Sequence, residues 1–390
     1  MINLYMLQIF CIGRFWLMKL VHLSDLHLGK RMDEFSLLED QKHILDEIIG
    51  IIDAEKPEVV LICGDIYDKP NPPAEAEKLM DEFTFQLAER KLPTIIISGN
   101  HDSAQRIAFG ARLMNKSGIH LSPVYNGKVE PIVLTDEYGE VRFYPLPFVK
   151  PIHVRRAFED AEITSYTDAV RTAIENMNVD PTARNVLITH QFVTGAERSE
   201  SETVSVGGTD NVDASVFDGF DYVALGHIHG PQSVERETIR YCGTPLKYSF
   251  SEKDHVKSVT VCELGAKGDV MVRTVPLTPL RDLRDVRGCF ADIIASKPTY
   301  DFVRVILTDE NDIPDAMNKL RRIFRNITQI RYDNARTRAE SEIGEAEEID
   351  TKTPIELFEE LFEQQNGRKM DINQRELCER LFEEISEAAK

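Results

Sequence analysis

The sequence predicts an α/β protein in which the strands of a mainly parallel sheet alternate with helices. Two observations favour this fold class. Apolar runs at 19–23, 59–63 and 94–97 are separated by segments whose apolar residues recur at helical spacing. Short polar motifs follow these and later apolar runs, and the carboxyl ends of parallel strands share one edge of a sheet. The chain therefore fits a helix-covered sheet with a cleft along that edge.

The composition is that of a globular protein with more than one domain. Its 390 residues are 42% hydrophobic, enough to bury a large core, and we expect two or three units. The net charge of −20 has the wrong sign for a protein that holds nucleic acid by charge alone. Residues 341–390 carry fifteen acidic and six basic side chains. A polyanionic substrate would consequently need divalent metal ions or a basic partner.

Residues 1–18 form an apolar leader that the rest of the pattern does not require. Arg14 interrupts it, so it falls short of the ~20 residues of a membrane helix, and it lacks the features of a signal peptide. We expect translation to start at Met18; the alternative is a genuine leader, poorly ordered or bound to a partner. The six cysteines form no CxxC pair, which indicates a reducing compartment, the cytoplasm.

The segment 19–278 carries the predicted sheet and its helices. Ser36 and Glu39 indicate a capping box for a first helix, and a second helix is predicted at 74–90. The apolar faces of these two helices are formed by Leu38, Leu45, Ile48, Ile49, Ile52, Leu79, Phe83 and Leu87. The remaining predicted elements are strands within 119–145, at 186–189, at 222–225 and within 239–275, and a helix near 155–177.

A small α/β domain, assigned to 279–335, begins within a segment rich in proline and charge at 276–288. Its predicted elements are a strand at 302–307, a helix at 314–324 and a strand at 328–332. Residues 336–352 are acidic and almost without large apolar side chains, which is typical of a flexible linker.

Two amphipathic helices are predicted in the C-terminal segment 353–390. Thr353 and Glu356 form a capping box for the first, and Asn373 is the predicted cap of the second. The apolar stripes are Ile355, Phe358, Leu361 and Phe362 in the first helix and Leu377, Leu381, Phe382 and Ile385 in the second. These stripes either cover the body of the protein or dock onto another protein.

Five motifs with metal-ligating side chains follow predicted strands. They are Asp25-Leu26-His27, Gly64-Asp65, Gly99-Asn100-His101-Asp102, His190 and Gly226-His227-Ile228-His229. Seven ligands exceed the need of one tetrahedral ion and suit two octahedral ions that share a bridge. Alternate residues of an extended segment point the same way, so the DxH and GHxH spacings bring both side chains to one cluster. The candidate metal ligands are Asp25, His27, Asp65, Asn100, His190, His227 and His229.

The order of these motifs resembles the calcineurin-like metallophosphoesterases over roughly 19–275. The resemblance implies a metallophosphoesterase sandwich, here with a small α/β capping domain and C-terminal helices. It also implies a binuclear site in which Asp65 bridges the ions. Asp25, His27 and His229 would complete one site, and Asn100, His190 and His227 the other. His101 would protonate the leaving oxygen, with Asp102 either orienting it or stabilising the turn.

A narrower resemblance is to the SbcD family, the nuclease subunits of bacterial SbcCD complexes. It is carried by MKLVHLSDLHLGK, GDIYD, GNHDSAQR, DYVALGHIHGPQ, YCGTPLKYSFSE and PIELFEELFEQQNGR. It implies a manganese-dependent DNA exonuclease and endonuclease, with Mg²⁺ as the alternative metal. The expected partner is an SbcC-type ATPase bound by the C-terminal helices, within a heterotetramer that contains a homodimer of this chain. No GxxxxGK[ST] motif occurs, so the ATPase would be that partner.

Three basic residues beside the motifs, Lys30, Arg31 and Arg106, are candidate DNA contacts, although solvated surface charge is the better explanation for each one taken singly. Two other functions remain open at this point. One is a phosphodiesterase of the same superfamily that acts on a small molecule. The other is a scaffold subunit with a vestigial metal site.

Overall fold

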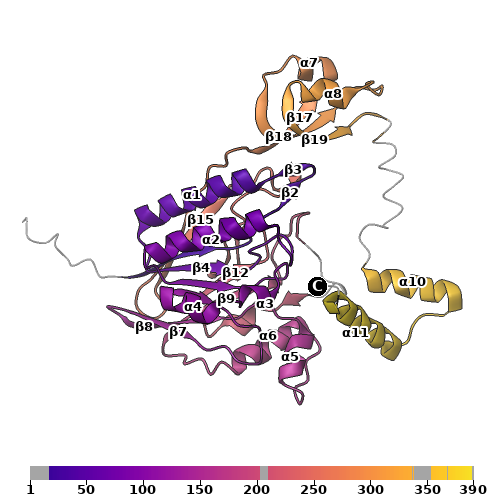
Figure 1. Cartoon of the computed structure of the whole chain (residues 1–390). Coiled ribbons are helices and arrows are strands. Elements are labelled where there is room, and N and C mark those ends of the chain that lie inside the picture. Colours follow the sequence, from indigo (N-terminus) through magenta and orange to yellow (C-terminus); the bar gives the residue numbers. More distant parts are fainter. Residues whose placement is uncertain (1–16, 203–209, 336, 338–352, 367, 389–390) are drawn as a thin grey trace, which may run out of the picture.

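Two sheets lie at the centre of the computed structural model, which describes residues 17–202, 210–335, 337, 353–366 and 368–388 (Figure 1). The first contains β1 (Met18–Leu23), β4 (Val59–Cys63), β5 (Thr94–Ile97), β6 (Ile119–Leu121), β15 (Ser258–Leu264) and β16 (Val270–Pro276). The second contains β7 (Ile132–Asp136), β8 (Gly139–Pro145), β9 (Arg184–His190), β12 (Tyr222–Gly226), β13 (Gln232–Val234) and β14 (Arg236–Tyr241). Their strand orders are β16-β15-β1-β4-β5-β6 and β13-β14-β12-β9-β8-β7.

Four neighbouring strands of each sheet are parallel, and the other strands pair antiparallel beside them. In the first sheet β1, β4, β5 and β6 are parallel, and in the second β8, β9, β12 and β14 are. Val59–Cys63 is buried at every position, as expected for a strand covered on both faces. Every parallel strand therefore ends at the edge that carries the predicted motifs.

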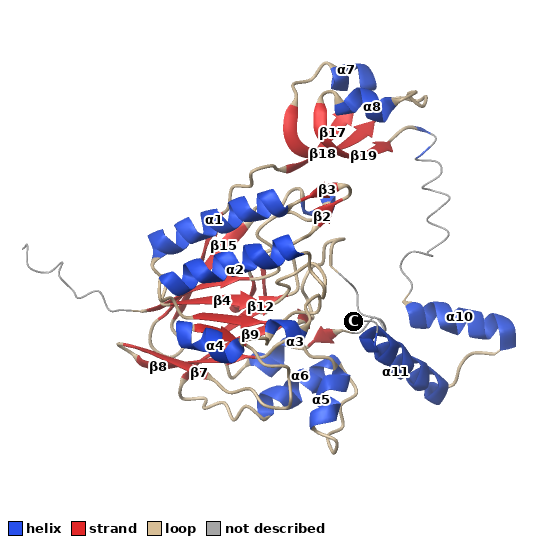
Figure 2. Cartoon of the chain, in the orientation of Figure 1, coloured by secondary structure: helices blue, strands red, loops and turns tan. Residues whose placement is uncertain are grey.

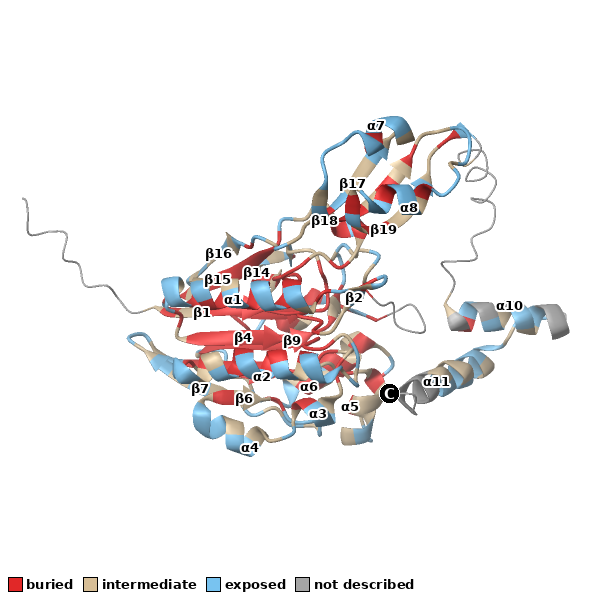
Figure 3. Ribbon diagram, turned by 45° about the horizontal axis from the view of Figure 1, so that its top comes forward, coloured by how far each residue is buried: buried red, intermediate tan, exposed pale blue. Residues whose placement is uncertain are grey.

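The sheets pack face to face, and helices cover their outer faces (Figure 2). Leu20, Leu61 and Ile97 of the first sheet meet Phe143 and Ile188 of the second in one buried cluster. The helices α1 (Leu38–Glu55) and α2 (Ala74–Glu89) cover the first sheet, and α5 (Pro151–Ala157) and α6 (Tyr166–Glu175) cover the second. The predicted metallophosphoesterase sandwich is confirmed, and Figure 3 shows its strands buried between the layers.

Several predicted boundaries are wrong in detail. β1 begins at Met18, which pairs with Leu264, one residue earlier than expected. The Ser36 capping box does not form, because β3 (Phe35–Ser36) pairs Ser36 with Arg31 of β2 (Arg31–Met32); the cap position is Leu37.

The helix predicted near 155–177 is two helices. The break comes where Ser165 and Asp168 form a capping box for α6, so that segment begins a new helix. Two short helices also lie after β5, namely α3 (Ala104–Ile107) and α4 (Ala111–Met114).

The small domain is a three-stranded parallel sheet with two helices. Its elements are β17 (Leu283–Gly288), α7 (Phe290–Ile294), β18 (Thr299–Leu307), α8 (Ala316–Arg321) and β19 (Phe324–Tyr332). The sequence predicted β18, α8 and β19 but missed β17 and α7. β17 is an edge strand with exposed Arg284 and Arg287, so its pattern resembled a charged loop.

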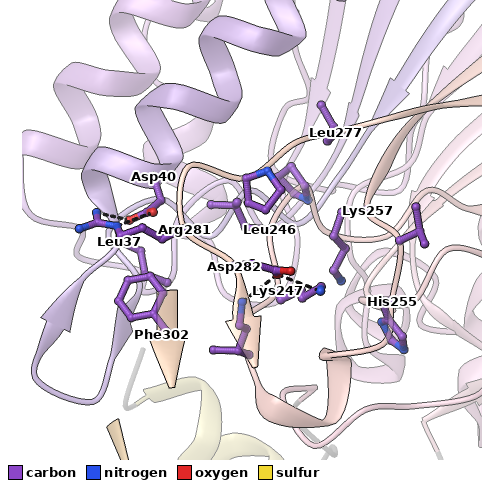
Figure 4. Close-up of a pocket in the computed structure, with 14 residues that line it drawn as sticks. Leu37, Asp40, Leu246, Lys247, His255, Lys257, Leu277, Arg281, Asp282 and Phe302 are labelled. Atoms are coloured by element: carbon purple, nitrogen blue, oxygen red, sulfur yellow. Dashed lines mark hydrogen bonds and ion pairs between the residues drawn. The ribbon is translucent and has the colours of Figure 1, made fainter. Parts of the chain in front are cut away.

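The small domain contacts the sandwich through aromatic and ionic groups. The rings of Phe302 and Phe35 lie 5.9 Å apart, and the Arg304 guanidinium lies 4.5 Å from the ring centre of Phe250. A cavity of about 210 Å³ lies at this junction, and its lining includes the Arg281–Asp40 and Lys247–Asp282 ion pairs. Figure 4 shows both pairs among the lining side chains.

The C-terminal helices α10 (Pro354–Asn366) and α11 (Ile372–Ala388) pack on each other, with the rings of Phe358 and Phe382 5.9 Å apart. The Thr353–Glu356 capping box is confirmed. The predicted cap at Asn373 is wrong, because Asp371 and Gln374 form the box instead.

The predicted leader (1–18) falls outside the described residues except for 17 and 18, and the predicted linker (336–352) except for 337. No helix in the described part of the chain is both long and apolar enough to cross a membrane.

Candidate metal centre

The five predicted motifs converge at one edge of the sandwich. Asp25 and His27 follow β1, Asp65 follows β4, and Asn100 and His101 follow β5. His190 ends β9, while His227 and His229 follow β12. The first three motifs come from one sheet and the last two from the other. The strand-end motifs predicted to converge therefore do so where the two sheets meet.

Asp25, His27 and His229 form one group, called here the first ligand group. Their ligand atoms all lie within 4.8 Å of one another. The Nε2 atoms of His27 and His229 are 3.2 Å apart, and Asp25 Oδ1 is 4.0 Å from His27 Nε2. All three side chains are buried. This is the set that the sequence assigned to one ion.

Asn100, His190 and His227 form the second ligand group. Asn100 Oδ1 lies 2.9 Å from His190 Nε2 and 2.9 Å from His227 Nδ1. Asp65 Oδ2 lies 3.3 Å from His190 Nε2 and 3.8 Å from His27 Nε2. The Asp65 carboxylate thus lies between the two groups, where a bridging ligand belongs.

The donor set fits divalent cations. The Nδ1–H of His190 donates to the Cys63 carbonyl oxygen at 2.7 Å, which leaves the Nε2 lone pair facing the oxygens of Asp65 and Asn100. Lone pairs directed at one another repel unless a cation lies between them. The electrostatics agree, because Asp65 and Asp25 overcome the effect of burial and raise the pKa of His190 to about 9. The pocket therefore favours positive charge.

The backbone at the ligands is unusual. Asp25, His27, Asp65 and His227 have positive φ angles of 53°, 43°, 48° and 101°. Non-glycine residues rarely adopt such angles, and their clustering at one place indicates a functional constraint.

The positions of the glycines beside the ligands leave no room for a side chain. A Cβ on Gly64 would lie 2.6 Å from His190 Nδ1, and one on Gly99 would lie 2.2 Å from Asp65 Oδ1. On Gly226 it would lie 2.0 Å from the Cys63 carbonyl oxygen. A side chain at any of these three positions would therefore displace a ligand residue or the backbone beside it.

His101 lies beside the ligands and is less buried than they are. Its backbone N–H donates to Asp65 Oδ1 at 2.8 Å, and its Nδ1–H donates to the Asp68 carbonyl oxygen at 2.9 Å. Its Nε2 is 4.0 Å from Asp65 Oδ2, and its side chain is 23% exposed. This placement lets Nε2 face a bound substrate.

Asp102 stabilises the turn. Its carboxylate accepts hydrogen bonds from the backbone N–H groups of Ile66, Tyr67 and Gly99. These bonds tie the loop after β5 to the loop after β4. Of the two roles left open for Asp102, the structure supports this one.

Sequence reasoning missed the residues that hold His229. Ser201 Oγ lies 2.7 Å and Glu252 Oε1 3.4 Å from His229 Nδ1. The fully buried Glu252 also pairs with Lys257 Nζ at 2.5 Å. Although burial opposes ionisation, His229 and Lys257 hold the pKa of Glu252 well below its usual range. Glu252 is the last residue of the YSFSE stretch, which carried the family resemblance. Nothing in that stretch shows which histidine the carboxylate faces.

A second missed carboxylate lies behind His27. Asp68 Oδ1 is 3.8 Å from His27 Nδ1 and is paired with Lys30 Nζ at 2.8 Å. Asp68 is the last residue of the GDIYD stretch, so the sequence did offer it as a candidate site residue. Asp68, His27 and His101 also form a third cluster of ligand atoms within 4.8 Å.

The three candidate DNA contacts all have protein partners. Lys30 pairs with Asp68, Arg106 pairs with Glu77 at 2.6 Å, and Arg31 donates to the Glu34 carbonyl oxygen. The histidines outside the motifs include His22, whose Nδ1 accepts from the Tyr222 hydroxyl at 2.9 Å while Nε2–H donates to the Leu225 carbonyl oxygen. Burial lowers the pKa of His22 to about 3, so it is a neutral structural residue.

Comparison with known proteins gives two family matches. Residues 18–231 match the calcineurin-like phosphoesterase family, and residues 279–366 match the type 5 capsule protein repressor C-terminal domain. The SbcD subunit of the SbcCD nuclease of Staphylococcus epidermidis is 35% identical over 352 residues, which cover 87% of this chain and 92% of that protein. A solved dimetal phosphatase from Danio rerio is 12% identical, with a TM-score of 0.41 and coverage of 67% and 98%. The chain therefore belongs to the calcineurin-like phosphoesterases and, within them, to the SbcD family.

Proposed function

We propose that this chain is a metal-dependent DNA nuclease subunit. The observation that carries the proposal is the pair of adjoining ligand groups with the Asp65 carboxylate between them. The relative named as a nuclease subunit supports DNA as the substrate. In this role the chain hydrolyses phosphodiester bonds as an exonuclease on duplex ends and as an endonuclease on single strands and hairpins.

Each ligand residue has a proposed role. Asp65 would bridge two divalent ions, Mn²⁺ by preference or Mg²⁺. Asp25, His27 and His229 would hold one ion, and Asn100, His190 and His227 would hold the other. Two such ions would supply an activated water and neutralise the charge that develops on the phosphate.

His101 is the proposed general acid. Its Nδ1–H donates to the Asp68 carbonyl, so Nε2 is the ring nitrogen that would carry, in the imidazolium form, the proton that passes to the leaving oxygen.

The test is a cleavage assay on purified protein stripped of metal and then loaded with Mn²⁺ or Mg²⁺. Metal-dependent cleavage of hairpin and plasmid DNA, with two ions bound per chain, is the expected result. Cleavage of small phosphodiesters alone would favour the small-molecule alternative. Absence of bound metal would favour the scaffold alternative, although the site contains the full ligand set.

We propose that α10 and α11 dock onto an SbcC-type ATPase. Phe358, Leu361, Leu377 and Leu381 are all exposed, although Phe358 contacts α11. Burying one such side chain is worth roughly 1.5–3 kcal/mol, so a partner that covers several of them would bind firmly. Deleting 351–390 should abolish co-purification with the ATPase and ATP-stimulated duplex degradation while single-strand cleavage persists. Undiminished binding by the truncated chain would contradict this role.

A homodimer is part of the same proposal. Phe85 on α2, Phe109 after α3 and Leu113 on α4 are 60%, 84% and 73% exposed. Such apolar side chains suit a second copy of the chain. Replacing Phe109 with Glu should shift the sedimentation coefficient toward that of a monomer, whereas Phe358→Glu should not. We place the complex in the cytoplasm, in keeping with the unpaired cysteines that the structure describes.

A further inference from the structure

A cavity of about 590 Å³ opens beside the second ligand group. Asn100 and the loop after β5 form one wall, and Phe148 and Lys150, which follow β8, form another. Residues 124–126 close a third side. The volume falls within the roughly 300–1,000 Å³ of small-ligand sites. The cavity therefore extends from Asn100, in the candidate metal centre, to the residues that follow β8 of the second sheet.

We propose that this cavity binds one unstacked nucleotide of a DNA single strand, the nucleotide next to the phosphate that is cleaved. The inference rests on the proposed nuclease function and adds to it a site that reads the base. Three properties of the walls support it: aromatic rings, a cation that no described carboxylate pairs with, and a buried hydroxyl without a hydrogen-bond partner among the described residues.

The aromatic rings are those of Phe148 and Tyr125. The Phe148 ring stands edge-on to the His190 imidazole, with centroids 6.2 Å apart and planes at 88°. The aromatic wall of the cavity thus begins directly beside a candidate metal ligand. Single-strand binding proteins use such rings because every base has a π face that can stack on them.

The charge of the cavity differs from that of the chain as a whole. Lys150, His153 and Arg156 line it, while the chain carries a net charge of −20. Among the described residues of the lining, Asp102 supplies the one carboxylate, and its oxygens accept three backbone N–H groups. The cavity therefore attracts a phosphate.

Lys150 is the cation in the lining that is best placed to bind a phosphate. The described part of the chain offers its Nζ no carboxylate, in contrast with Lys30 and Arg106, which pair with Asp68 and Glu77. A lysine that no carboxylate pairs with can bind a phosphate without first breaking an ion pair.

Polar groups in the walls match the edge of a base. The Tyr125 hydroxyl is buried and has no hydrogen-bond partner among the described residues. Burial raises the pKa of Tyr125 to about 12, so the hydroxyl stays protonated and can donate. Ser103, Gln105 and Asn126 add side-chain donors and acceptors. A base in the cavity would satisfy the buried hydroxyl, which otherwise costs free energy.

The first experiment moves one abasic nucleotide along a short single-stranded oligonucleotide and measures kcat and KM with Mn²⁺. For the unaltered protein, cleavage next to the abasic position should have a KM higher by roughly tenfold, the scale of one lost stacking contact. Tyr125→Leu should reduce this discrimination, and Tyr125→Phe should reduce it less. Equal cleavage of abasic and intact strands by the unaltered protein would overturn the proposal.

The second experiment uses Lys150→Gln with Lys116→Gln as a matched control, because Lys116 is exposed and does not line the cavity. Lys150→Gln should reduce the slope of log affinity against log salt by about 0.7, the value for one phosphate contact on a single strand. Lys116→Gln should leave the slope unchanged. The proposal is wrong if the two variants behave alike.

A small chromogenic diester, bis(p-nitrophenyl) phosphate, separates failure of this inference from failure of the proposed function. If the unaltered protein hydrolyses this diester but no DNA, the nuclease function itself fails. If it cleaves DNA without regard to the missing base, only the nucleotide site fails. Lys116→Gln should hydrolyse the diester at the unaltered rate, since Lys116 is exposed and does not line the cavity.

Discussion

His190 and His229 lie in the two halves of the candidate centre and are held in different ways. The Nδ1–H of His190 donates to the Cys63 carbonyl, a backbone group at the end of β4. The Nδ1 of His229 faces Ser201 Oγ and Glu252 Oε1, and Glu252 is fixed in turn by Lys257. One half of the centre is oriented by the fold, and the other by side chains that can be replaced one at a time.

The difference has a consequence for how mutations act. A backbone carbonyl cannot be mutated without moving the strand, so the support at Nδ1 of His190 cannot be removed by replacing a side chain. The first ligand group can also be weakened from outside, through Glu252 or through Asp68 behind His27. Residues that orient a metal ligand are worth roughly 10–100-fold in metal affinity or activity.

The largest effect is expected where the two halves meet. Asp65→Ala should remove the shared carboxylate, reduce cleavage of single-stranded DNA to background and lower the bound metal below two ions per chain. His227→Ala should also abolish cleavage, because it removes a ligand from one half. Plasma mass spectrometry of the purified variants measures the metal. The exposed Asp46→Ala variant is the control, and it should behave as the unaltered protein does.

His101→Ala should cause the next largest loss of activity. It should not weaken metal binding in either ligand group. His101 is proposed to transfer a proton and not to bind metal, so kcat should fall by roughly 10²–10⁴-fold while both ions remain. Single-turnover cleavage and metal analysis test the two statements separately. Full activity in this variant would remove His101 from the mechanism.

Glu252→Gln tests the comparison directly. The amide cannot hold the Lys257 ammonium and the His229 imidazole as the carboxylate does, so Mn²⁺ binding to the first ligand group should weaken by roughly 10–100-fold. The second group should keep its affinity, so a calorimetric Mn²⁺ titration should separate into two steps. Glu237→Gln, on the exposed side of β14, is the matched control. Equal weakening of both steps would show that the two halves are not supported independently.

Deleting residues 1–17 should have the smallest effect. The chain would then start at Met18, which is buried and is the first residue of β1. The other end of this strand, at Leu23, leads into the metal centre. The supporting contacts described for the two ligand groups all come from residues that follow β1. The melting temperature and the rate of cleavage should be unchanged, and a lower melting temperature would show that the leader belongs to the fold.

The sequence predicted the parts of the molecule that depend on local patterns. The buried runs gave the central strands, and the motifs gave every residue of the two ligand groups because each motif lies at a strand end. Glu252, Lys257 and Ser201 escaped prediction, because nothing in the local sequence shows which histidine a distant carboxylate or hydroxyl faces. The same limit explains the wrong Ser36 cap, since its pairing with Arg31 is a tertiary choice.

The left-handed backbone at Asp25, His27, Asp65 and His227 bears on how an inactive enzyme should be made for trapping bound DNA. Asp, Asn and His adopt this conformation more readily than other non-glycine residues, and a misfit costs roughly 1–3 kcal/mol. Alanine at Asp65 would therefore add strain to the loss of a ligand, whereas asparagine keeps both the turn and the side-chain shape. Asp65→Asn is consequently the variant to choose for crystallising the protein with an uncut strand.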